Sequence, residues 1–424
     1  MRLTKEEKNW VLYDVGNSAF TLLVSTIMPI YFNYLAEEAG LSSVDYLAYW
    51  GYAASIATLV VALIGPVFGT LADTKGFKKP IFTIALGVGA TDCIALGFAR
   101  QWLLFLLIYI IAKIGYSASL IFYDSMLSDV TDEERMDQVS SQGYAWGYIG
   151  SCIPFAVCLG IVLGAEKLGI TMELAMGIAF GVVAVWWVAM TLPMLKTYRQ
   201  THYVERTPHA FAESFRRIGR TFQNVKKEKK VFLFLLAFFF YIDGVYTIID
   251  MATAYGSALG LDSTGLLLAL LVTQIVAFPC AILFGRLAQR FQAEWLITVC
   301  IAAYLGIALF ACILSTQTQF WILAILVGMF QGGIQALSRS YYAKIIPAEQ
   351  SGEYFGLMDI CGKGASFLGT TVVSVVSQLT GNINKGVGMI AVFFVIGIIL
   401  FRISVMDDKR GLFDVPSAPH SKLF

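Results

Sequence analysis

Stretches of about 20 consecutive apolar residues recur along the whole chain, and they restrict its fold more than any motif does. Each stretch is long enough to cross the hydrocarbon core of a bilayer as a helix. The composition agrees, because 58% of the 424 residues are hydrophobic and only 14% are charged, against about 25% charged in a soluble protein. The sequence therefore predicts an all-α membrane protein with twelve transmembrane helices. The predicted spans lie near residues 10–36, 47–72, 80–99, 102–128, 139–164, 172–194, 231–256, 264–288, 295–315, 320–343, 354–379 and 386–406.

One long polar segment separates the sixth predicted span from the seventh. It divides the chain into a six-helix half (1–195), a basic linker (196–230), a second six-helix half (231–406) and a tail (407–424). Within the linker, the pattern AFAESFRRIGRTF is typical of an amphipathic surface helix. A short repeat, FGTLAD in the first half and FGRLAQ in the second, ends the second span of each half. Two pseudo-symmetric halves around a central site are common in transporters.

The basic residues are distributed unevenly between the two sides of the predicted membrane. If the N-terminus is cytoplasmic, all but five of the 30 Lys and Arg residues lie on the cytoplasmic side. The opposite side holds only Arg100, Lys167 and Lys385, while Lys113 and Lys363 lie within spans. By the positive-inside rule we expect both termini and the linker to be cytoplasmic. The compactness of the chain favours a bacterial inner membrane.

The loop after the second span reads GTLADTKGFKK. Gly69 would permit close helix approach, and Asp73 could cap a helix or pair across the interface between the halves. Gly76 would allow a tight reversal, and Lys78 and Lys79 would hold the loop inside. This pattern resembles the loop signature of the major facilitator superfamily. The resemblance implies a two-half transporter fold in which this loop takes part in conformational change.

Two departures from that signature affect the expectation. Phe77 stands where a basic residue is frequent, and Gln289 replaces the acid at the corresponding place of the second half. Any charge relay in the second half should therefore be weaker or absent.

Four further segments carry a narrower resemblance. They are WVLYDVGNSAF (10–20), SQGYAWGYIGS (141–151), FYIDGVYTII (240–249) and QGGIQALSRSYYAKIIP (331–347). They resemble the vacuole effluxer-like family, which includes autophagy-related permeases that return amino acids from vacuoles and many bacterial members. The resemblance implies efflux of a small solute. Asp124 departs from it, because we would expect an asparagine there.

Polar side chains inside spans are costly and need partners, so they are candidates for function. They concentrate in the first, fourth, seventh and tenth spans, which line the central cavity if the superfamily assignment holds. The candidates for a substrate or proton pathway are Asp14, Asn17, Lys113, Tyr116, Tyr123, Asp124, Asp243, Tyr246, Thr247, Asp250, Gln331, Gln335 and Lys363. Arg339, at the cytoplasmic end of the tenth span, is grouped with the conformational loop motif.

Several of these candidates have a structural alternative. Asp243 could pick up a proton if it is desolvated in a cavity, or it could form a structural ion pair with Lys113. Asp250 could be a gate or a hydrated rim residue. Asp14 could pair with a cytoplasmic-side base. Lys363 could pair with Asp359 one helical turn away, or meet a substrate carboxylate.

The sequence favours a secondary active transporter that exports a small polar or zwitterionic solute, with amino acids as the first choice, by proton-coupled alternating access. One alternative is the same fold carrying a sugar derivative, a drug or a lysolipid, and another is a membrane sensor without transport. The motifs HExxH, GxSxG, paired CxxC and the P-loop are absent from the sequence, so we expect no enzyme activity. We expect no cofactor, no metal and no nucleic-acid partner, and a monomer in the lipid bilayer.

Overall fold

The computed structural model describes residues 2–206, 225 and 228–411, and the regular secondary structure of this part of the chain is helical apart from one isolated β-bridge between Thr74 and Val204. Side chains at some further positions, Lys363 among them, also lie outside the described residues. The expected amphipathic helix of the linker falls in the undescribed range 207–224.

The first half contains the following helices. They are α1 (Lys5–Leu22), η1 (Leu23–Ile27), α2 (Met28–Glu38), α3 (Ser43–Ala72), α4 (Lys78–Leu96), α5 (Trp102–Ser125), α6 (Leu127–Val130), η2 (Glu133–Arg135), α7 (Met136–Leu163), α8 (Ala165–Leu168) and α9 (Met172–Thr197). The helices α1, η1 and α2 run on as one membrane span, with a π-helical turn at η1.

The second half repeats this plan. Its helices are α11 (Lys229–Ala258), α12 (Ser263–Leu287), α13 (Ala293–Ala311), α14 (Gln317–Ile345), η3 (Ala348–Gln350), α15 (Ser351–Thr380), α16 (Ile383–Gly388) and α17 (Ile390–Gly411).

Capping side chains set where several long helices begin. A capping box starts α14, where the Thr316 hydroxyl accepts from the backbone N–H of Gln319 and the Gln319 side chain accepts from the backbone N–H of Thr316. An equivalent box, formed by Thr4 and Glu7, starts α1. These interactions satisfy backbone donors that a helix N-terminus would otherwise leave unpaired.

Eleven of the described helices are long and apolar enough to cross a membrane. The twelfth expected span, 354–379, corresponds to α15, in which the described apolar stretch Leu368–Thr380 is shorter. The predicted fold class, an all-helical polytopic membrane protein of two six-helix halves, agrees with this architecture.

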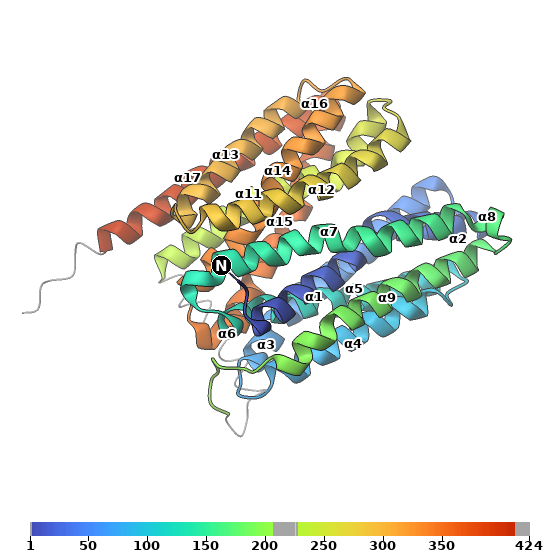
Figure 1. Ribbon diagram of the computed structural model, residues 1–424. Coiled ribbons are helices and arrows are strands. Elements are labelled where there is room, and N and C mark those ends of the chain that lie inside the picture. The colour runs from blue at the N-terminus through green and yellow to red at the C-terminus, as the bar shows by residue number, and fades with distance from the viewer. Residues whose placement is uncertain (1, 207–224, 226–227, 412–424) are drawn as a thin grey trace, which may run out of the picture.

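The two halves meet at one end of the molecule and lie apart at the other (Figure 1). We call the end at which they meet the linker face. It is formed by the segments 73–77, 126–135, 198–206 and 346–350, and the described chain begins and ends there. At the opposite end, α8 of the first half and α16 of the second lie well apart (Figure 1). Across the halves, α3 packs against α15, and α7 packs against α12 and α14.

The halves also repeat one internal contact. The Tyr13 hydroxyl on α1 lies 2.6 Å from Ser119 Oγ on α5. In the second half, the Tyr241 hydroxyl on α11 lies 2.7 Å from Ser338 Oγ on α14. Both pairs are buried and join the first and fourth spans of their half, which supports a pseudo-symmetric arrangement.

Candidate functional site

The loop after α3 connects the first half to the start of α15. Asp73 accepts hydrogen bonds from the backbone N–H groups of Gly352 and Glu353, with N···O distances of 2.8 Å and 2.9 Å. A carboxylate at a helix N-terminus is stabilised by unpaired backbone donors and by the helix dipole. Gly69 allows this approach, because a Cβ there would lie 2.2 Å from the Gly352 carbonyl oxygen.

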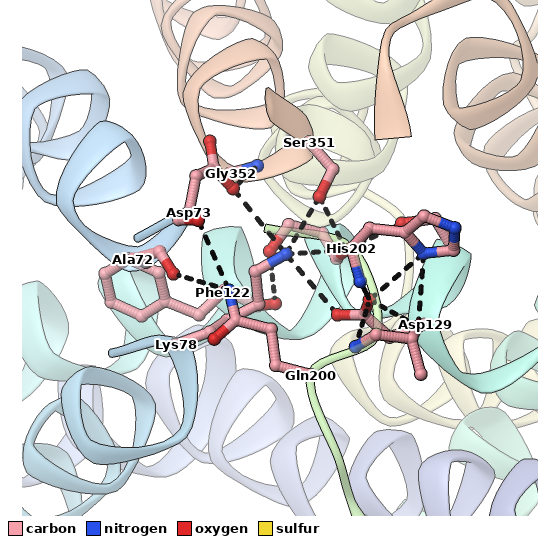
Figure 2. Close-up of polar contacts among 12 residues, drawn as sticks. Ala72, Asp73, Lys78, Phe122, Asp129, Gln200, His202, Ser351 and Gly352 are labelled. Carbon is pink, nitrogen blue, oxygen red and sulfur yellow. Dashed lines mark hydrogen bonds and ion pairs between the residues drawn. The ribbon is translucent and has the colours of Figure 1, made fainter. Parts of the chain in front are cut away.

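Lys78 bridges acidic groups of the first half to the second half (Figure 2). Its Nζ lies 3.6 Å from Asp73 and 3.5 Å from Asp129. It also donates to Ser351 Oγ, at 2.9 Å, at the start of α15. The side chain is fully buried. By contrast, Lys79 is exposed, and Gly76 forms the turn with a φ of 80°.

A second connection is formed by Arg339 on α14, whose side chain enters the first half. Its Nη1 lies 3.0 Å from Asp124 Oδ1 and its Nη2 lies 3.2 Å from Asp14 Oδ2. It also donates to the hydroxyl of Ser140 on α7, at 2.9 Å. The guanidinium carbon is 4.3 Å from the ring centroid of Tyr144, a cation–π geometry. The side chain is only 4% exposed, so these partners replace water for a buried charge.

Asp14 is held by residues from its own half as well. The Tyr123 hydroxyl donates to Asp14 Oδ2 at 2.8 Å, and Asn17 Nδ2 donates to Oδ1 at 3.3 Å. The pairing of Asp14 with a base, one of the sequence-based alternatives, is therefore present, and that base is Arg339. Asp14, Asn17, Tyr123 and Asp124 form one cluster around it.

Further polar contacts join α7 to the second half. The hydroxyl of Tyr148 lies 2.8 Å from Gln335 Oε1, and Asp137 accepts from Ser340 and Lys344 of α14, each at 2.6 Å. Gln331, on the same helix, is buried.

Gln289, which follows α12, also contacts α7. It donates to Gln138 Oε1 at 2.9 Å, so the second copy of the loop motif makes a neutral contact where the first makes an ionic one.

Asp243 lies inside the second half, between α11 and α15. Its Oδ1 accepts from the backbone N–H of Gly369 at 2.9 Å and from Thr247 Oγ1 at 3.2 Å. The residue is fully buried, and Oδ2 has no hydrogen-bond partner among the described residues. The ion pair with Lys113 considered from the sequence is not found among the described contacts of Asp243.

The charge of Lys113 on α5 lies within electrostatic range of the Asp250 carboxylate on α11 of the second half. Its ammonium group also lies 5.7 Å from the ring centroid of Tyr109. Asp250 is exposed, and Tyr246, one turn before it on α11, lies within electrostatic range of it.

Tyr116 completes this polar region on the side of the first half. Its hydroxyl lies 2.6 Å from the hydroxyl of Thr21 on α1, and its ring is within electrostatic range of Tyr246. The first, fourth and seventh spans therefore bring polar groups toward one another.

The predicted site residues thus form four main described groups: the Asp73–Lys78 network at the start of α15, the Arg339 cluster, the Asp243 site and the Lys113–Asp250 region. Sequence reasoning missed Ser140 and Tyr144, which hold Arg339, and His202, which contacts Asp129. Tyr144 lies in the segment 141–151 that carries the family resemblance, but its spacing does not indicate a contact with Arg339. The spacing of Ser140 and His202 does not mark them either, because each contacts a residue far away in the chain. The Lys363 side chain lies outside the described residues.

Sequence comparison finds one matching family, described as "Vacuole effluxer Atg22 like", over residues 3–414. A relative from Bacillus subtilis (strain 168), called an uncharacterized MFS-type transporter YxiO, is 44% identical over 404 residues, covering 94% of both chains. Autophagy-related protein 22 of Cryptococcus neoformans (strain JEC21) is 26% identical over 311 residues, covering 68% of this chain and 53% of that protein. This chain therefore aligns with about half the length of that fungal relative.

Structural comparison finds transporters of the same fold. The human organic anion transporter MFSD10 matches with a TM-score of 0.71 and 14% identity, covering 94% of this chain and 100% of that one. A bacterial homologue of the iron transporter ferroportin, in an outward-facing state, matches with a TM-score of 0.70 and 14% identity, covering 96% and 100%. At such identities the likeness concerns the fold alone.

Proposed function

Because the chain belongs to the vacuole effluxer Atg22-like family of transporters, we propose that it exports a small zwitterionic solute of the amino-acid class by proton-coupled alternating access. The relatives give the transporter class and leave the solute open. The solute class is argued from one observation, the presence of Lys113 and Asp250 on opposite halves within electrostatic range of each other.

This pair of charges suits a ligand that carries both signs. A carboxylate would bind the Lys113 ammonium group, and an ammonium group would bind Asp250. Since the two residues belong to different halves, a ligand that contacts both also contacts both moving parts. The hydroxyl groups of Tyr116 and Tyr246 add hydrogen-bonding capacity nearby.

The linker face is proposed to be cytoplasmic, because the Lys and Arg residues gather there. The contacts of Asp73 and Arg339 close that face, so the structure would correspond to the outward-facing state. Export then requires a second state, in which these contacts are broken and the cytoplasmic side opens to load the solute.

Asp243 is the proposed proton carrier. Among the described residues, Asp243 Oδ2 has no hydrogen-bond partner. An ionised carboxylate in that setting is costly, and a proton on Oδ2 would remove the cost. Its other oxygen binds the backbone of α15 at Gly369. α15 is also the helix whose first turn is capped by Asp73, so a change at Asp243 can reach the interface between the halves through one rigid helix.

The test is flux of a mixed pool of radiolabelled amino acids in proteoliposomes with an imposed pH gradient. We compare wild type with Asp243→Asn and Lys113→Met, and use Lys167→Met, at an exposed position outside these groups, as the matched control. We expect gradient-driven flux in wild type and the control, loss of the gradient response in Asp243→Asn, and a strongly raised KM in Lys113→Met.

Each alternative has its own signature. Flux that keeps its gradient response in Asp243→Asn would assign Asp243 a structural role. Absence of amino-acid flux from folded protein would overturn the solute class, and thermal-shift screening of sugars, drugs and lysolipids would then follow. Failure of every candidate to bind or move would favour a sensor without transport.

A further inference from the structure

The first residues of the linker bind back onto the loop motif of the first half. We call residues 198–206 the linker strap. The backbone of Val204 donates to the Asp73 carbonyl at 2.8 Å and accepts from the Lys75 N–H at 3.0 Å. The side chain of Gln200 accepts from the Gly76 N–H at 2.9 Å. The strap is therefore fixed to the turn whose Asp73 side chain caps α15 (Figure 2).

The strap also surrounds Asp129, which follows α5 in the short helix α6. Tyr198 donates its hydroxyl to Asp129 at 2.5 Å, Thr201 donates its hydroxyl at 2.9 Å, and the backbone N–H of His202 donates at 2.8 Å. Lys78 lies 3.5 Å away on the other side of the carboxylate. These donors together hold the pKa of Asp129 at about 2, although burial by itself would raise it.

The His202 ring contacts the Asp129 carboxylate and lies within electrostatic range of Glu349 of the second half. Its Nδ1 lies 3.3 Å from Asp129 Oδ1, and the side chain is 39% exposed. The hydrogen bond to Asp129 raises the pKa of His202, while partial burial opposes the rise. Glu349, in η3 of the second half, adds to the rise by its charge, and the Lys78 ammonium group opposes it. These are the charged groups from α6, η3 and α4 that act on the ring.

We propose that the linker strap is a pH-responsive clamp on the closed linker face, in which protonated His202 joins Asp129 of the first half to the charge of Glu349 in the second. Asp129 shares Lys78 with Asp73 and Ser351, so the imidazolium strengthens a network that already crosses the interface. The clamp does not depend on which solute is carried.

The direction of the pH effect follows from linkage. Glu349 belongs to the second half, so its charge acts on His202 while the two halves are in contact, and His202 then binds a proton more tightly than in the open state. The contribution of His202 to closure is therefore fully present below the ordinary histidine pKa of about 6.5. That contribution is lost as the pH rises through the higher pKa of the clamped state. Acidification around the linker face therefore favours the closed linker face, and alkalinisation loosens it.

The experiment is hydrogen exchange by mass spectrometry on full-length protein in nanodiscs, at pH 6 and pH 8. The readout is the peptide containing Gly352 and Glu353, whose amide groups are bonded to Asp73 only while the halves are in contact. Wild type, His202→Gln and Glu349→Gln are compared with His209→Gln, which removes the other histidine of the linker. Comparison at one pH cancels the intrinsic pH dependence of exchange.

We expect His202→Gln to exchange this peptide several-fold faster than wild type at pH 6 and at the same rate at pH 8. Glu349→Gln should lose less protection of this peptide at pH 6 than His202→Gln does. His209→Gln should exchange at the wild-type rate at both pH values. Equal protection of wild type and His202→Gln at pH 6 would overturn the proposal. A loss of protection in His202→Gln that is as large at pH 8 as at pH 6 would also overturn the proposal. Such a result would mean that His202 acts by packing and not by charge.

Discussion

Arg339 on α14 lies 3.2 Å from Asp14 on α1, although 325 residues separate them in the chain. The guanidinium group enters the opposite half and replaces its water of hydration with two carboxylates, a hydroxyl and aromatic faces. Such a buried ion pair contributes little net stability compared with apolar packing, but it is costly to leave half-made. The ion pair therefore favours the conformation in which Arg339 and Asp14 are in contact.

Arg339→Gln should open the linker face. Removing one partner from a buried ion pair typically costs about 3–5 kcal/mol, because the remaining charges lie buried without compensation. We expect faster hydrogen exchange at the start of α15 and a lower thermal midpoint, while Arg286→Gln, at an exposed position of α12, should behave as wild type. If the start of α15 exchanged hydrogen as slowly in Arg339→Gln as in wild type, this assignment would be contradicted.

The two copies of the loop motif should differ in their sensitivity to mutation. Asp73→Asn removes the charge from a carboxylate that accepts two backbone hydrogen bonds, and hydrogen bonds to charged groups contribute about 1.5–3 kcal/mol each. Gln289→Ala removes a single neutral contact with Gln138, worth about 0.5–1.5 kcal/mol. Hydrogen exchange at the starts of α15 and α7 measures both effects. A larger effect from Gln289→Ala would reverse our interpretation of the asymmetry.

The membrane spans and the loop motif could be predicted from the sequence because each is a local pattern. Apolar length determines a span, and the substitution of Gln289 for an acid is visible in the short repeat itself. The partners of the loop motif could not be predicted as fully. The sequence indicates that Asp73 can cap a helix, but it does not indicate that the helix is α15. That partner depends on the packing of two halves against each other.

The assignment of Asp14, Asp124 and Asp243 shows the same limit more clearly. All three are acids within spans, and the sequence placed all three among the candidates for a substrate or proton pathway. In the structure, Asp14 and Asp124 bind Arg339, while Asp243 is bonded to Gly369 inside the second half. Helical periodicity gives the face on which a side chain lies, but it does not give the rotation of that helix relative to its neighbours.

Gly369→Ala should disrupt the Asp243 site. A Cβ at this position would lie 2.1 Å from Thr247 Oγ1 and 2.4 Å from Asp243 Oδ1, so the two side chains or the helices must move apart. Overpacking of this kind costs about 1–3 kcal/mol. The matched control is Gly362→Ala on the same helix, where a Cβ would have an ordinary contact of 3.5 Å with Phe238. We expect a lower thermal midpoint and loss of gradient-driven flux in Gly369→Ala only. Equal behaviour of both variants would show that the contact is not needed.

Asp129 should give the linker face a defined acid sensitivity. Its pKa of about 2 in the structure lies below the ordinary value for aspartate, since Lys78, His202 and Tyr198 outweigh the effect of burial. A lowered pKa contributes stability above the unfolded value of about 3.9, and that contribution is lost as the pH falls toward 2. Two pKa units correspond to about 2–3 kcal/mol. At pH 7 we therefore expect Asp129→Asn to melt below wild type, and the gap between the two thermal midpoints should narrow as the pH approaches 3.

Asp132→Asn, at an exposed position three residues away, is the control and should melt as wild type does at neutral pH. A gap that stayed constant between pH 7 and pH 3 would mean that Asp129 stabilises the face by shape alone, without its charge.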